Sequence, residues 1–115
     1  MDTEDLARFG ELLAATGERR ELTVSELYEA GWLLGEVAAY TAALARHLDA
    51  ELADLPGRVI LRDDTGGDPA ARITEAREHL ARYAELAAAA AEPASRYHSA
   101  AGHLAVAVDP GAAGD

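Results

Sequence analysis

The residues of this chain best suited to chemistry are its four histidines: His47, His79, His98 and His103. Metal ligation from one helix face needs histidines four residues apart or a Glu-x-x-His pair, and neither spacing occurs. His98 and His103 are five residues apart, which splays their rings. The pattern favours surface or helix-capping histidines, and it leaves open a site between helices that joins His47 with His79 or His98. We therefore expect no metal and no cofactor.

An acidic run with two glycines, "RDDTGGD", occupies residues 62–68. It lacks the Asp-x-Asp-x-Asp-Gly ligand pattern and the glutamate at position twelve of a calcium loop. It also lacks the spaced glycines and the following lysine of a phosphate-binding loop. We interpret it as a flexible acidic turn in which Asp68 caps the next helix.

Nucleophilic catalysis needs an activated hydroxyl or thiol with a base beside it. Ser99 follows His98 directly, and neighbours in a helix point about 100° apart, so these two side chains do not face each other. Tyr40, His47 and Tyr83 could line a pocket between helices, although nothing in their spacing requires it. We assign no catalytic residue and expect a protein that is not an enzyme.

Helix start and stop patterns dominate the elements that carry these residues. Thr3 followed by two acids predicts a helix over about 4–16 that Gly17 ends. Thr23 and Glu26 fit a capping box at the start of a long helix over about 24–54. Asp68 before a proline predicts the start of a helix over about 69–91.

Pro93 is expected to end or kink the third helix, and a short C-terminal helix then runs to about residue 107. Residues 109–115 read as a flexible tail. Residues 58–62 hold Val59, Ile60 and Leu61, which could form a short strand or an extended apolar clip over the bundle; we favour the clip.

The predicted fold class is therefore all-α. It is a small helical bundle, one domain over 1–108, in which the long central helix packs antiparallel to the helix at 69–91. Short N- and C-terminal helices complete it. Along the central helix, apolar or small residues step by three and four as in a coiled coil: Val24, Leu27, Gly31, Leu34, Ala38, Thr41, Ala45, Leu48, Leu52 and Leu55.

The stretch "AGWLLGEVAAYTAALA", residues 30–45, carries one charge and is apolar on nearly every side. Gly31 and Gly35 each cost about 1 kcal/mol in a helix interior, which favours a close helix crossing there. A helix-turn-helix is rejected because its recognition helix would lack residues that reach base edges. The candidate helix-packing or interface residues are Gly31, Trp32, Leu33, Gly35, Val37, Tyr40 and Leu44.

Composition sets the remaining limits. The 115 residues carry a formal net charge of −11, which argues against nucleic-acid binding, and all ten positive charges are arginine. Alanine accounts for 28 residues against 29 larger apolar ones, a bias typical of GC-rich bacteria. The chain has no cysteine, no signal-peptide pattern and no apolar window long enough for a membrane span. We expect a cytoplasmic protein with no membrane partner.

An alanine-rich core stabilises one copy weakly, so the sequence favours self-association. The expected function is a small acidic regulatory or accessory protein, a non-enzymatic protein–protein interaction module that acts as a homodimer. Whether a second copy or a different protein covers the apolar surface of the central helix stays open. Two alternatives remain: a ligand-binding protein or enzyme with an inter-helix pocket, and an acidic inhibitor that imitates nucleic acid.

Overall fold

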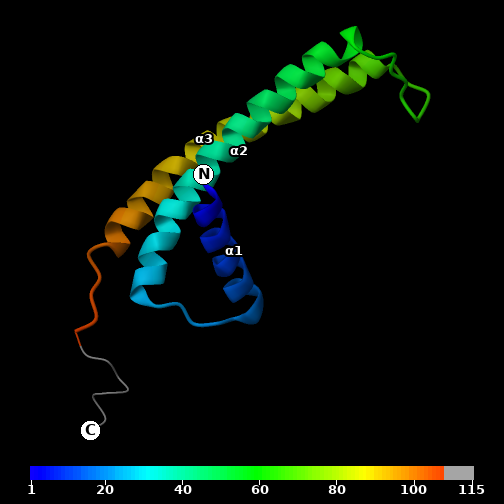
Figure 1. Cartoon of the computed structure of the whole chain (residues 1–115). Coiled ribbons are helices and arrows are strands. Elements are labelled where there is room, and N and C mark those ends of the chain that lie inside the picture. Colours follow the sequence, from blue (N-terminus) through cyan, green and yellow to red (C-terminus); the bar gives the residue numbers. More distant parts are fainter. Residues whose placement is uncertain (108–115) are drawn as a thin grey trace. The chain divides into compact units, whose positions relative to one another are not determined.

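The computed structural model describes residues 1–107 and contains three helices: α1 (Thr3–Glu18), α2 (Val24–Asp54) and α3 (Pro69–Ala101) (Figure 1). No strand occurs in residues 1–107, so the predicted all-α fold is confirmed. Contacts divide the chain into two compact units, one made of Met1–Val37 and Ala91–Asp115, the other of Ala38–Ala90. The tail expected at 109–115 lies outside the described residues.

The first helix is longer than its expected range of 4–16, and both of its predicted caps are wrong. Asp2, not Thr3, is the N-cap: its carboxylate accepts a hydrogen bond from the backbone N–H of Asp5 at 2.8 Å. Gly17 stays within the helix, and Arg19 ends it in the left-handed conformation with φ at 54°. The N–H of Arg19 then bonds to the carbonyls of Ala15 and Thr16, which satisfies groups that a helix end leaves free.

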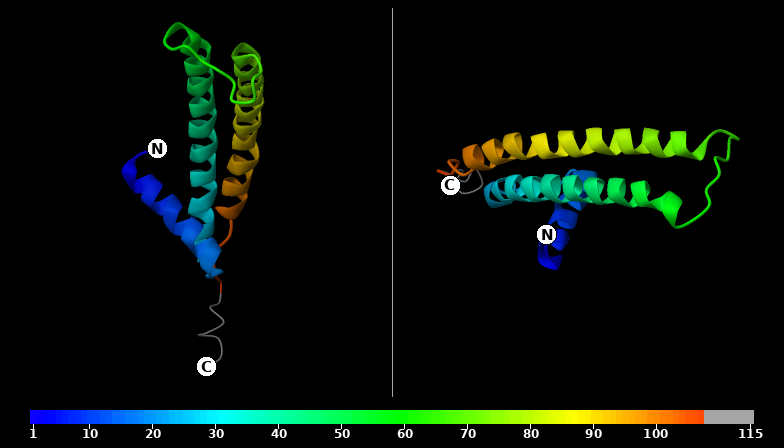
Figure 2. Two further views of the ribbon diagram at one scale, coloured as in Figure 1. Left: turned by 90° about the vertical axis from the view of Figure 1, so that its right-hand side faces the viewer. Right: turned by 90° about the horizontal axis from the view of Figure 1, so that it is seen from above.

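The second helix has the predicted bounds. α2 packs along α3, as expected for the two long helices, and Figure 2 shows them side by side from two further directions. In the second unit, Asp49 of α2 pairs with Arg77 of α3, and Ala45 lies beside Leu80 and Ala84. Residue numbers therefore fall along one helix as they rise along the other, which is the antiparallel arrangement.

The third helix differs from the prediction because it does not stop near residue 91. α3 runs through Pro93 to Ala101, so the separate short C-terminal helix is wrong. A proline inside a helix removes one backbone hydrogen bond and costs about 3 kcal/mol. The helix nevertheless continues, because alanines precede Pro93 and the turn beyond it is held on α2 through Tyr97. Gly102 follows the last helical residue, a usual place for glycine.

The connection between the long helices begins with a short 3₁₀ turn, η1 (Leu55–Gly57), and is irregular over 58–68. Residues 58–62 form no strand. The expected clip is only partial, because Leu61 is half-buried and lines a hollow with Pro69 and Ile73, whereas Ile60 is fully exposed. Asp68 begins α3 as predicted, since its carboxylate accepts the backbone N–H of Ala70 at 3.0 Å.

Alanine makes the core. Among the described residues, the buried apolar side chains are Leu33 and six alanines: Ala15, Ala38, Ala42, Ala45, Ala84 and Ala101. Leucines expected on the seam of α2, Leu34 and Leu48, are instead close to half exposed. The small residues face the neighbouring helix because they allow the two backbones to approach closely. Within residues 1–107, no helix has the length and apolar character that crossing a membrane requires.

Candidate interaction surfaces

The predicted interface residues divide into a buried and an exposed group. Gly31 and Leu33 are buried, and Leu33 is only 1% exposed. Gly35 and Val37 are half-buried. The three largest side chains point outward: Trp32, Tyr40 and Leu44 are 44%, 52% and 54% exposed.

The first unit contains a very close helix crossing at Gly31. A Cβ atom added to Gly31 would lie 2.7 Å from the Cβ and 2.8 Å from the Cα of His98, and 2.8 Å from Cδ1 of Tyr97. Such distances are shorter than real Cβ contacts, so only glycine fits between α2 and α3 here. A Cβ on Gly35 would meet nothing within 4 Å. The glycine pair of the sequence therefore has one member at the crossing and one beside open space.

Two side chains of α3, Tyr97 and His98, hold α3 on α2 at this crossing. The sequence did not predict this role for either residue. The Tyr97 hydroxyl donates to the backbone carbonyl of Leu27 at 2.7 Å. Nδ1 of His98 lies 2.7 Å from the carbonyl of Tyr28, and a carbonyl only accepts, so Nδ1 carries the proton. The His98 ring also stacks on Tyr28 with ring centres 4.0 Å apart. His98 is thus a packing residue between α2 and α3.

Helix α1 is attached to the first part of α2 through charged groups. Arg8 of α1 donates from Nε to a carboxylate oxygen of Glu29 at 2.7 Å, and a second guanidinium nitrogen contacts the other oxygen. A two-point contact of this kind fixes geometry as well as charge. Glu29 and Leu33 are four residues apart and share one face of α2. The buried Leu33 therefore lies on the face that α1 covers.

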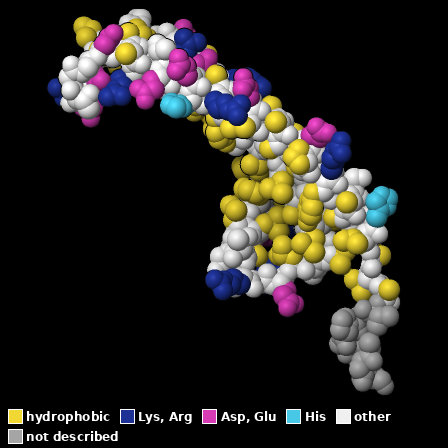
Figure 3. Space-filling model, turned by 180° about the vertical axis from the view of Figure 1, so that it is seen from behind, with side chains coloured by type: hydrophobic (Ala, Val, Ile, Leu, Met, Phe, Trp, Pro, Cys, Tyr) yellow, Lys and Arg dark blue, Asp and Glu magenta, His cyan; other side chains and the backbone are white. Residues whose placement is uncertain are grey.

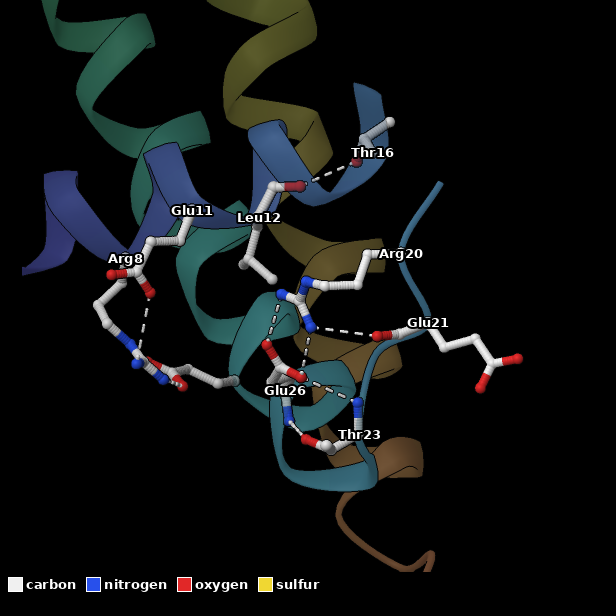
Figure 4. Close-up of polar contacts among 9 residues, drawn as sticks. Arg8, Glu11, Leu12, Thr16, Arg20, Glu21, Thr23 and Glu26 are labelled. Atoms are coloured by element: carbon white, nitrogen blue, oxygen red, sulfur yellow. Dashed lines mark hydrogen bonds and ion pairs between the residues drawn. The ribbon is translucent and has the colours of Figure 1, made fainter. Parts of the chain in front are cut away.

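The start of α2 is a complete capping box, as predicted. The Thr23 hydroxyl accepts from the backbone N–H of Glu26 at 3.1 Å, and the backbone N–H of Thr23 donates to the Glu26 carboxylate at 3.0 Å (Figure 4). Arg20 adds an ion pair to the same carboxylate at 3.0 Å. The hydrogen bond from Arg20, followed by that from the Thr23 backbone, lowers the pKa of Glu26 from 4.5 to about 2.

Because of this cap, the free energy of unfolding depends on pH. Because the pKa of Glu26 is lower in the folded protein than in the unfolded chain, its contribution is complete above pH 4.5 and is lost as the pH falls toward 2. We expect carboxyl ¹³C NMR to show Glu26 titrating near pH 2. In Arg20→Gln the midpoint should rise toward 4.5, whereas Arg82→Gln, which removes a distant ion pair, should leave it unchanged. A wild-type midpoint near 4.5 would contradict this account.

Large apolar side chains lie at the surface of all three helices. Figure 3 shows hydrophobic side chains gathered over much of one face of the molecule. In the first unit the exposed ones include Leu6 and Leu13 of α1, which are seven residues apart and therefore share one face of that helix. In the second unit the helices expose Tyr40, Leu44, Leu48, Tyr83 and Leu86.

The pocket suggested by the sequence has no direct support from side-chain contacts. Tyr40, His47 and Tyr83 are all exposed, and no hydrogen bond or ring contact joins any two of these described residues. A cavity of about 390 Å³ lies elsewhere in the second unit, where Leu52 and Leu55 face Leu61 and Ile73. It is an open, mainly apolar hollow beside the connection.

The acidic turn beside that hollow is ordered by its own hydrogen bonds. The Asp63 carboxylate accepts the backbone N–H of Thr65 at 2.9 Å and its hydroxyl at 2.8 Å, and Arg72 donates to it at 2.9 Å. These bonds, the Thr65 backbone first, lower the pKa of Asp63 to about 2. Gly66 turns the chain with φ at +84°. Among residues 1–107, no group of three or more histidines and acids is placed to hold a metal ion.

Many of the remaining acids of the long helices are paired with arginine. Asp49 pairs with Arg77 and Glu51 with Arg58, each at 2.7 Å. These are surface ion pairs, so each contributes little to stability. They do, however, neutralise these carboxylates.

Comparison with known proteins gives no further guide to this arrangement. No family model, curated protein or solved structure matches the chain at a significant level.

Proposed function

We propose that the protein is a non-enzymatic protein–protein interaction module, a small acidic accessory or regulatory protein that acts as a homodimer. One observation carries the proposal: the described core holds six alanines and a single larger side chain, Leu33, while many large apolar side chains stay exposed on the helices. A buried methylene group contributes about 0.8 kcal/mol, and a fully buried leucine about 1.5–3 kcal/mol. Association would bury the larger groups that one copy leaves in water.

The charged groups support a binding role over catalysis. A general acid or base works best with a pKa near the working pH. The shifted carboxyl groups, Glu26, Glu29, Asp49 and Asp63, all have a lowered pKa because arginine or backbone donors hold their charged form. Their chemistry is that of fixed anions in ion pairs, which position helices.

Imitation of nucleic acid is a weaker alternative, because many of the carboxylates are held in ion pairs. Such an inhibitor presents a row of free negative charges to a basic protein. Four acids along α2 already hold arginines from elsewhere in the chain: Glu26, Glu29, Asp49 and Glu51. The surface that α2 offers a partner is therefore more apolar than its acid content indicates.

Light scattering after size exclusion tests the homodimer. Over about 1–100 µM, a range that covers micromolar dissociation constants, we expect a particle of twice the 12.1 kDa chain mass at the upper end. The thermal unfolding midpoint should rise with protein concentration, because association stabilises the folded state by mass action. A particle of single-chain mass throughout, with a midpoint independent of concentration, would contradict self-association.

A further inference from the structure

The second unit, Ala38–Ala90, carries a cluster of exposed apolar side chains on its two helices. We call it the hairpin patch and define it by Leu44 and Leu48 of α2 and Tyr83 and Leu86 of α3. These side chains are 43–54% exposed. Tyr40, one turn before Leu44, lies at its margin and is equally exposed.

The central side chains of the patch, Leu44 and Tyr83, lie on the same side of the helix pair. A shallow groove lined by Ala45, Arg46, Ala81 and Glu85 marks the opposite side. Leu44 is two residues before Arg46 and Tyr83 is two residues after Ala81, a rotation of about 200° around each helix. Both therefore point away from the groove. Because Ala45 lies beside Leu80 and Ala84, Leu44 and Tyr83 lie at the same level of the antiparallel pair.

The hairpin patch is large enough to contribute most of a small interface. Half-exposed side chains of this size leave on the order of 100 Å² each, or roughly 400 Å² per copy and 800 Å² over two copies. Ala87 and Ala90, four and seven residues after Tyr83 on the same face of α3, add area and allow close helix approach. A specific interface needs about 1,000 Å² in total.

Charge indicates what covers this patch. The second unit has nine carboxylates and six arginines, a net charge of −3, while the rest of the chain has twelve and four, a net charge of −8. Two copies therefore repel each other least through their second units. Glu51, three residues after Leu48 on α2, is paired with Arg58. A strongly basic partner would find few free acids here, whereas an apolar surface of low charge suits its own copy.

We propose that two copies of the chain associate through the hairpin patch, so that two helix pairs form a four-helix layer about a two-fold axis. This inference rests on the proposed function, since it names the surface through which the homodimer forms. Leu44 and Tyr83 are its central contacts.

Sedimentation equilibrium on two matched double variants tests the proposal. Leu44→Glu with Leu48→Glu places two charges in the patch, and we expect the dissociation constant to rise at least about 100-fold, as for loss of central interface contacts. The control is Leu6→Glu with Leu13→Glu, two leucines of α1 that are 56% and 57% exposed. It should leave dimerisation nearly unchanged. Circular dichroism should show wild-type helix content in both.

Each outcome separates the two proposals. If the wild type dimerises and only the α1 variant dissociates, the patch inference is wrong and the homodimer stands. If the patch variant remains a dimer, the inference is again wrong. If the wild type is a monomer, self-association itself fails.

A second measurement covers the case in which the patch variant loses helix content. The chain has no cysteine, so Arg82→Cys gives a single spin-label site beside Tyr83 without touching the patch. Packed helices lie about 10 Å apart, so labels on two copies should be within about 30 Å of each other. A clearly longer distance between the two labels of a dimer would overturn the proposal.

Discussion

Replacing Gly31 with alanine is expected to lower the free energy of unfolding by about 1–3 kcal/mol, although alanine is the better helix former. The added Cβ would lie 2.7 Å from Cβ and 2.8 Å from Cα of His98. Both atoms are at or next to the backbone of α3, so the clash is not relieved by rotation of a side chain. The helices must separate or bend.

Gly35→Ala is the matched control, one turn further along the same helix. A Cβ there meets nothing within 4 Å, so the variant should gain up to about 1 kcal/mol from helix propensity alone. The same substitution at the two glycines should thus have opposite signs, and chemical denaturation of both at one protein concentration measures this. Gly31→Leu should be still less stable, because a larger side chain enters the same space.

The local structure offers a second readout. The stack of His98 on Tyr28 and the bond from Nδ1 to the Tyr28 carbonyl depend on the close crossing. The NMR resonances of the His98 ring should shift in Gly31→Ala and remain in place in Gly35→Ala. Equal stability of the two variants would mean that the crossing is looser than the structure indicates.

The starts of α2 and α3 could be predicted because their caps are encoded locally. The capping box at Thr23 and Glu26 and the cap at Asp68 use side chains within three residues of the groups they bind. Pro93 was misleading because its local cost is offset by contacts formed far along the chain. Tyr97 beyond it bonds to Leu27, and no local pattern contains that information.

Which residues face the partner helix was harder to predict, because alanine and leucine both count as apolar in a periodicity. The sequence pattern placed Leu34 and Leu48 on the seam of α2 along with Ala38 and Ala45, yet only the two alanines are buried there. Close packing selects the smaller side chain, and this displaces the larger ones to the flanks. The same displacement produces the exposed apolar surfaces on which the functional proposal depends.

Gly31 stood out from sequence because glycine inside a helix has a cost that packing must offset. Its neighbours Tyr97 and His98 did not, since only the tertiary pairing of α2 with α3 brings them to it. Residues of the hairpin patch were partly named as well: Leu44 from its apolar surroundings, and Tyr83 as a possible pocket residue. That these residues form one surface could not be predicted, because it depends on which faces of α2 and α3 are covered by the other helix.

Leu33→Ala should be the most damaging truncation in the first unit, with a loss of about 2–5 kcal/mol in the free energy of unfolding. Leu33 is the one large side chain among the described residues that is fully buried. Its removal leaves a cavity on the face of α2 that α1 covers. Leu34→Ala is the control: the neighbouring leucine is 49% exposed, so its truncation should cost less than about 1 kcal/mol.

Amide hydrogen exchange can show which helix loses stability in Leu33→Ala. Removing Leu33 weakens the apolar contact under α1 but leaves the Arg8–Glu29 pair, which is partly exposed and contributes little alone. Amides of α1 should therefore exchange faster in Leu33→Ala, while those of α3 around Ala84 keep their protection. If both leucine variants lose equal stability, or if exchange rises in α3 and not in α1, then Leu33 does not hold α1 on α2.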